Sequence, residues 1–135
     1  MPFVRISLKK SVSPETQRDI ANAVQAALIG AIGVPEQDRF QIIETLPDGI
    51  IYDPTYLGVA RDDGIVMIEI HLSIGRSVVQ KQALYRAIAD NLAKLLIRRE
   101  NVFIHLVEMT RENWSFGNGI AQYVESPPPH LAGLQ

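Results

Sequence analysis

The residue with the clearest chemical potential is Pro2, which directly follows the initiator methionine. Proline is a small second residue of the kind whose initiator methionine is normally removed, so we expect Pro2 to begin the mature chain with a secondary amine. A terminal amine titrates near pH ~8 in a model chain, and a proline amine is somewhat more basic. Such an amine can act near neutrality as a base, as an acid or as a nucleophile that forms an iminium ion.

A second chemical candidate, Arg76, lies between a strongly apolar stretch and the helix expected to begin at Ser77. In parallel α/β units, ligands gather at the carboxyl ends of strands, beside helix N-termini that favour anions. We therefore expect Arg76 to bind a carboxylate, assisted by N–H groups near Ser77. The alternative is an arginine that is only solvated.

Alternating and periodic apolar residues predict the elements that position these side chains. Strands are expected over residues 3–8, 39–45, 65–72 and 102–107. One helix begins after Ser13 and ends at Gly33, and a second begins after Ser77. Their inward stripes are predicted to be Ile20, Val24, Ala27, Leu28 and Ala31 in the first helix, and Leu84, Ile88, Leu92, Leu95 and Leu96 in the second.

The two halves of the chain can be overlaid, because a shift of 64 residues carries Ser13 onto Ser77 and the first apolar stripe onto the second (77 − 13 = 64). The sequence therefore predicts an α/β (α+β) fold, a duplicated β-α-β arrangement with two helices on one face of a four-stranded mixed sheet. A single domain is expected over 1–135, with units at 2–46 and 65–108 and a C-terminal loop and tail at 109–135. The other sheet face is left for another subunit.

Composition excludes several classes of protein. Hydrophobic residues make up 47% and charged residues 21%, which is ordinary for a globular chain, and the net charge of −2 argues against nucleic acid as a partner. Cysteine is absent, and His71, His105 and His130 lack metal-ligand spacing, so no metal is expected. No apolar run approaches the ~20 residues of a membrane span, and we expect no signal peptide before the first strand. A soluble cytoplasmic protein without a membrane partner is expected.

Two motifs add to the proline at the start of the first strand. They are Gly33-Val34-Pro35-Glu36-Gln37-Asp38-Arg39-Phe40-Gln41 and Glu112-Asn113-Trp114-Ser115-Phe116-Gly117-Asn118-Gly119. In the residue types, order and approximate spacing of these motifs, the chain from Pro2 to about Tyr123 resembles the tautomerase superfamily, and within it the malonate semialdehyde decarboxylase branch. The resemblance implies a cofactor-free homotrimer with a tautomerase-like fold and a site near a subunit boundary.

By the same resemblance, residue roles can be assigned. Pro2 corresponds to the catalytic amine, Asp38 to an aspartate that activates or orients water, and Arg76 to an arginine that holds the substrate carboxylate. Trp114 and Phe116 correspond to aromatic residues that wall the pocket. Other interpretations remain open: Asp38 as a solvated turn carboxylate paired with Arg39, and the two aromatic residues as packing anchors. His71, His105 and Glu69 are expected at an interface or the edge of the core.

The chain departs from the decarboxylase pattern at Ile74, where that branch carries a first arginine, so the field on a bound carboxylate should be weaker. Leu28 occupies the expected histidine position of the cis-haloacrylic dehalogenase branch.

The preferred hypothesis is a cofactor-independent tautomerase of a 2-oxo acid such as phenylenolpyruvate, with a small carboxylate as substrate. The alternatives are a decarboxylase or hydratase of a small 3-oxo or unsaturated acid, and a non-catalytic oligomeric binding module that retains Met1. Whether Pro2 is neutral or cationic stays open.

Overall fold

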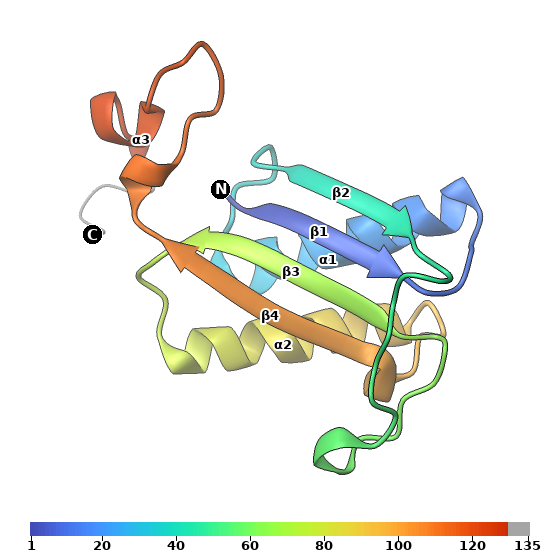
Figure 1. Cartoon of the computed structure of the whole chain (residues 1–135). Helices are drawn as coiled ribbons and strands as arrows, with labels where there is room; N and C mark the ends of the chain where they lie inside the picture. Colours follow the sequence, from blue (N-terminus) through green and yellow to red (C-terminus); the bar gives the residue numbers. More distant parts are fainter. Residues whose placement is uncertain (130–135) are drawn as a thin grey trace.

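Four strands and two long helices form the body of the molecule in a computed structural model that describes residues 1–129 (Figure 1). The remaining tail, with His130, lies outside the described residues. The long elements are β1 (Phe3–Leu8), α1 (Pro14–Ile32), β2 (Phe40–Thr45), β3 (Val66–Ser73), α2 (Val78–Ala93) and β4 (Val102–Met109), and a short helix, α3, spans Gln122–Glu125. Three 3-10 turns lie at Tyr56–Gly58, Arg99–Asn101 and Arg111–Asn113.

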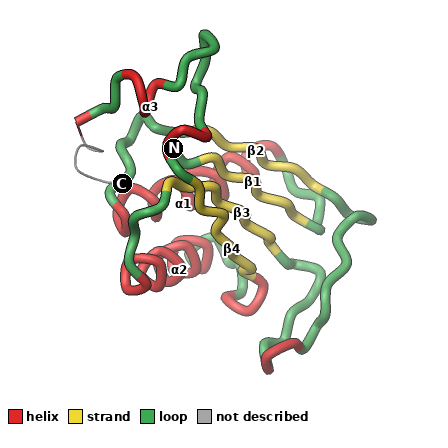
Figure 2. Tube along the Cα trace, turned by 60° about the vertical axis from the view of Figure 1, so that its left-hand side comes forward, coloured by secondary structure: helices red, strands yellow, loops and turns green. Residues whose placement is uncertain are grey.

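The sheet has the order β2-β1-β3-β4. Within each half the two strands are parallel, and the halves join through an antiparallel pair in which Phe3 lies opposite His71. Both long helices cover the same face of the sheet (Figures 1 and 2). The predicted mixed sheet with two helices on one face is confirmed, and the antiparallel centre brings the start of β1 beside the end of β3.

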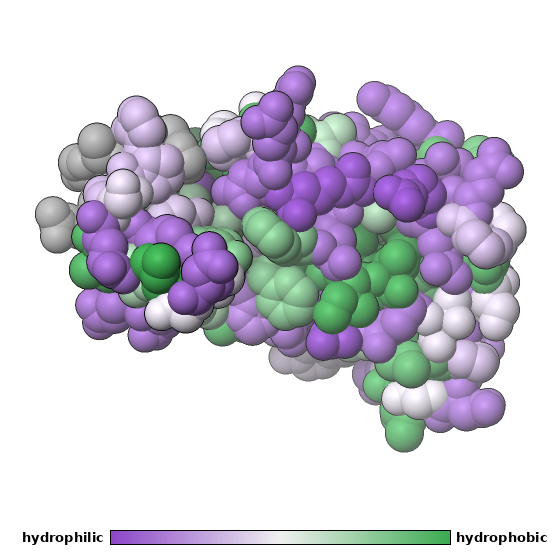
Figure 3. Space-filling model, turned by 90° about the horizontal axis from the view of Figure 1, so that it is seen from above, coloured by the Kyte–Doolittle hydropathy of each residue, from purple (hydrophilic) through white to green (hydrophobic). Residues whose placement is uncertain are grey.

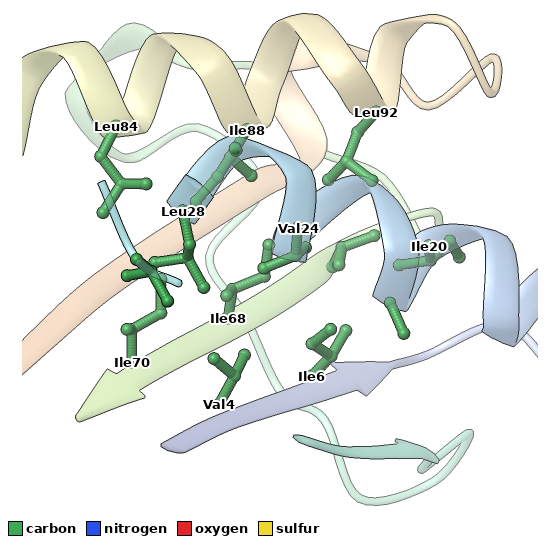
Figure 4. Close-up of a cluster of buried hydrophobic side chains, with 14 of the residues drawn as sticks. Val4, Ile6, Ile20, Val24, Leu28, Ile68, Ile70, Leu84, Ile88 and Leu92 are labelled. Atoms are coloured by element: carbon green, nitrogen blue, oxygen red, sulfur yellow. The ribbon is translucent and has the colours of Figure 1, made fainter. Parts of the chain in front are cut away.

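The two helices begin and pack in the same way, as the overlay of the halves predicts. The hydroxyl of Ser13 accepts the N–H of Thr16 at the start of α1, and Ser77 with Gln80 forms a capping box at the start of α2. The inward residues are almost completely buried against the sheet (Figure 4): Ile20, Val24 and Leu28 from α1, Leu84, Ile88 and Leu92 from α2, and Val4, Ile6, Ile68 and Ile70 beneath them.

The prediction that Leu95 and Leu96 point inward is wrong. Helix α2 ends at Ala93, and the N–H groups of Leu95 and Leu96 bond three residues back, which tightens the turn. Leu96 then takes a left-handed backbone (φ 65°), and its side chain is 93% exposed. The apolar period of 3.6 residues no longer applies once the helical backbone stops, so the stripe ends one turn earlier than the sequence pattern.

The second face of the sheet carries no helix among the described residues. It presents the large apolar residues Phe40, Ile42 and Phe103 at the surface, each at least 39% exposed. Polar groups lie between them, including Glu69, whose carboxylate is 2.6 Å from His71. Seen from above, apolar side chains gather at the surface between hydrophilic ones (Figure 3). Within residues 1–129, no helix is long and apolar enough to cross a bilayer.

Candidate active site

The chain start is buried among polar and aromatic side chains rather than exposed to solvent. The amine of Met1 donates hydrogen bonds to Oδ1 of Asp38 at 2.6 Å and to the hydroxyl of Tyr123 at 3.0 Å, and the Met1 residue is 1% exposed. Asp38 precedes β2, and Tyr123 belongs to the short C-terminal helix α3. The chain start, the loop before β2 and helix α3 are far apart in the sequence, and they meet at Met1, next to Pro2.

Asp38 is held by the loop that joins α1 to β2. Gly33 ends α1 with a left-handed backbone (φ 70°), a conformation that favours glycine, and the chain then turns back so that the N–H of Asp38 bonds to the carbonyl of Pro35. Buried Gln25 of α1 donates its amide to the Asp38 carbonyl at 3.2 Å. Arg39 donates to the neutral side chains of Gln41 and Asn22, not to Asp38. The carboxylate of Asp38 thus contacts the terminal amine. The alternative interpretation, in which Asp38 pairs with Arg39, is wrong.

Arg76 lies on the other side of Met1, after the end of β3. Its Nη1 donates to the backbone carbonyl of Ser73 at 3.2 Å and lies 3.8 Å from the Met1 sulfur. Burial lowers the pKa of Arg76, and the negative field of Glu108 opposes that effect; an arginine still carries its charge at any physiological pH. The N–H of Ser77 bonds to the Gln80 side chain, and the N–H of Gln80 bonds to the Ser77 hydroxyl, so these two groups are engaged within the helix cap. Assistance to Arg76 from the other N–H groups near Ser77 stays a prediction.

The C-terminal loop supplies aromatic side chains around the chain start. Trp114 and Phe116 stack with ring centroids 5.4 Å apart, and Phe116 meets the edge of Tyr123 at 4.7 Å. The Gln122 side chain fixes the loop, because it accepts the Phe116 N–H and donates to a carbonyl of the loop. Trp114 and Phe116 pack against the buried Met1–Tyr123 pair. A neighbouring hollow of about 260 Å³ is lined by Phe3, Phe40, Trp114, Ser115 and Phe116.

Tyr123 is the site residue that the sequence did not single out. It is 7% exposed, and burial raises the pKa of its phenol to about 12, with the Asp38 charge acting in the same direction. The phenol is therefore neutral at ordinary pH. Sequence alone offers one signal for it, a single tyrosine in the segment that follows the Trp114 motif.

Burial and neighbouring charges at the chain start shift the pKa of the Met1 amine. Burial is the largest influence and lowers the pKa of the Met1 amine from its usual value of 8.0. The hydrogen bond and the charge of Asp38 act in the opposite direction, and the positive Arg76 lowers the pKa further. The balance is a lowered pKa, so the Met1 amine loses its proton more readily than a solvated chain start does.

Other candidates lie away from this cluster. His71 and His105 both face Glu69 on the uncovered sheet face, at 2.6 and 3.6 Å. Ile74 is 39% exposed near Arg76 in the chain and supplies no charge. Among residues 1–129, no group of three or more histidine, aspartate and glutamate side chains could hold a metal ion.

The amino-acid sequence matches tautomerase family models and a probable tautomerase. Two family models, each described as tautomerase enzyme, match residues 2–58 and 38–117. The chain is 41% identical to the probable tautomerase YusQ of Bacillus subtilis (strain 168), over 93% of this chain and 100% of that protein.

Solved structures show the same similarity. An FG41 malonate semialdehyde decarboxylase, inhibited by 3-bromopropiolate, superposes with a TM-score of 0.85 at 38% identity, covering 90% of this chain and 94% of its own. A fused 4-OT described as an asymmetric trimer shares the fold with a TM-score of 0.73 at 18% identity, covering 91% of this chain and 98% of its own.

Proposed function

Because the chain belongs to the tautomerase superfamily and lies within its malonate semialdehyde decarboxylase-like branch, we propose that it ketonises the enol of a 2-oxo acid such as phenylenolpyruvate with the amine of Pro2. The observation that carries this proposal is the hydrogen bonding of the Met1 amine to Asp38 and Tyr123 beside Arg76.

The Pro2 nitrogen is three bonds from the Met1 nitrogen, so the two atoms lie roughly 3 Å apart. Removal of Met1 makes Pro2 the terminal amine and frees the space that the Met1 residue fills. That space borders Asp38, Tyr123 and Arg76, and it adjoins the aromatic hollow of Trp114 and Phe116. A small carboxylate with an aromatic tail matches these surroundings in charge and polarity.

In the proposed reaction, Arg76 holds the carboxylate and neutral Pro2 acts as the base. Pro2 takes the enol O–H proton, and the oxygen electron pair becomes the C=O bond. The C=C electrons then form a C–H bond with the proton that the Pro2 ammonium returns to the adjacent carbon. In support of a neutral Pro2, burial lowers the pKa of the amine that occupies this place while Met1 is present.

The test is phenylenolpyruvate ketonisation, followed by loss of enol absorbance, with a Pro2→Ala variant of verified N-terminus. We expect kcat/KM to fall by about 10² or more, in the range that general acid–base groups contribute. Pro14→Ala, at the first position of α1, is the matched control and should keep full activity. Full activity in Pro2→Ala would rule out a proline-centred reaction.

Decarboxylation of a 3-oxo acid is the second candidate, supported by the 38% identity to a malonate semialdehyde decarboxylase and by the contact of Asp38 with the terminal amine. It would require cationic Pro2 to stabilise the developing enolate and Asp38 to orient water. A coupled assay with malonate semialdehyde, run beside the ketonisation assay on the same preparation, distinguishes the two.

We also propose that the protein is a homotrimer built on its uncovered sheet face. Phe40, Ile42 and Phe103 are exposed there, and such apolar groups are typical of an interface. The fused 4-OT with this fold is a trimer. Analytical ultracentrifugation should give three copies, and Phe103→Glu should dissociate them.

A further inference from the structure

Ser73 has a buried hydroxyl that makes no hydrogen bond to any of residues 1–129. It is the last residue of β3, it is 2% exposed, and its Oγ has no hydrogen-bond partner within the described part of the chain. A hydroxyl buried in this way forfeits its bonds to water, so native structures nearly always pair it. The unpaired Oγ of Ser73 is therefore a donor available to a ligand.

Ser73 lies beside the chain start. The antiparallel pairing of β1 with β3 ends with Phe3 opposite His71, two residues from Met1 and two residues from Ser73, so the chain start and the end of β3 lie at the same end of this strand pair. Arg76 touches both residues, since its Nη1 contacts the Ser73 carbonyl at 3.2 Å and the Met1 sulfur at 3.8 Å. Removal of Met1 thus frees the space next to Ser73 and Arg76.

We propose that the Ser73 hydroxyl donates a hydrogen bond to the carboxylate of the substrate, beside the guanidinium of Arg76. A carboxylate has about four lone-pair sites, and one arginine fork satisfies two of them. The hydroxyl of Ser73 can donate to a third lone-pair site. It lies next to Ile74, which supplies no second guanidinium for the carboxylate. This inference rests on the proposed function, because it requires Pro2 as the chain start and a carboxylic acid as the ligand.

The experiment measures binding rather than turnover. Trp114 is the only tryptophan of the chain and packs against Met1, so its fluorescence reports a ligand that occupies this space. The probes are 3-phenylpropionate, which is an unreactive acid, and 3-phenylpropanamide, which has the same shape without the charge. Both are titrated into protein that begins at Pro2 by intact mass.

We expect Ser73→Ala to weaken the binding of 3-phenylpropionate roughly tenfold, as for loss of a hydrogen bond to a charged group. The binding of 3-phenylpropanamide should not change. Ser73→Cys, which is close in shape but a weak donor, should behave like alanine, whereas Ser73→Thr keeps the hydroxyl and should restore acid binding. In turnover of phenylenolpyruvate, Ser73→Ala should raise KM more than it lowers kcat.

Three results would overturn the proposal: equal acid binding in Ser73→Ala and the parent, an equal loss of acid and amide, or no binding of the acid by the parent. Failure of the proposed reaction gives a different pattern. Absent ketonisation together with acid binding that depends on Ser73 would reject the tautomerase reaction and keep the carboxylate donor.

Discussion

The nitrogen of Met1 lies 2.6 Å from Oδ1 of Asp38, across 37 residues of sequence. The contact joins the chain terminus to the loop between α1 and β2, and it couples the protonation of the amine to one carboxylate.

Activity should depend on removal of Met1, because Met1 fills the space beside Arg76 and ties up the Pro2 nitrogen in a peptide bond. Preparations treated to different extents with methionine aminopeptidase should show ketonisation in proportion to the fraction that begins at Pro2 by intact mass. Equal activity in unprocessed protein would contradict this prediction.

Asp38→Asn should move the pH profile to lower pH. Asp38 raises the pKa of the terminal amine against the larger effect of burial, so its loss lowers that pKa further. If neutral Pro2 is the base, kcat/KM increases as pH rises through this pKa, and the rising limb shifts to lower pH. If Asp38→Asn shifts the falling limb of the kcat/KM profile and not the rising limb, cationic Pro2 is the active form. The profile of kcat/KM from about pH 5 to pH 10 separates the two.

Tyr123→Phe should lower activity without harming the fold. The change removes the hydroxyl 3.0 Å from the terminal amine but keeps the ring against Phe116. We expect a loss of about three- to tenfold in kcat/KM, near the ~1 kcal/mol of one hydrogen bond, with the melting temperature within a few degrees of the parent. Tyr56→Phe, at a 65% exposed position, is the control and should change neither.

Ile74→Arg should favour decarboxylation. A guanidinium at this 39% exposed position would add a second fork for the substrate carboxylate. We expect malonate semialdehyde decarboxylation to rise about tenfold while ketonisation changes by less than about twofold. Ile74→Leu keeps the volume without the charge and should change neither rate. If Ile74→Arg also leaves both rates unchanged, Ile74 does not determine specificity.

Leu28→Ala should destabilise the protein by about 2–5 kcal/mol, because it opens a cavity at a completely buried position between α1 and the sheet. Leu96→Ala, at a 93% exposed position, should stay within about 0.5 kcal/mol. Urea unfolding at one protein concentration measures both, since an oligomer's stability depends on concentration. A loss of stability of equal size in both variants would contradict the assignment of the core.

The periodic pattern of apolar residues was enough to predict the strands, the long helices and their buried stripes, because alternation and 3.6-residue spacing follow directly from backbone geometry. The duplication of the two halves was predicted from the same spacing, with Ser13 and Ser77 as matching caps, whereas the antiparallel pairing of β1 with β3 came from the structure. Such patterns lose their meaning where the regular backbone stops, which is why Leu95 and Leu96 were assigned to the core wrongly.

Sequence by itself thus determined the fold, the family resemblance and the candidates Pro2, Asp38, Arg76, Trp114 and Phe116. Only the tertiary structure decided that Asp38 turns to the terminal amine and not to Arg39, that Tyr123 joins it from the far end of the chain, and that the Ser73 hydroxyl is buried with no hydrogen-bond partner among residues 1–129. Hydrogen bonds and pKa shifts depend on distance and burial, and these are set by how remote segments pack. No local pattern of residue types contains that information.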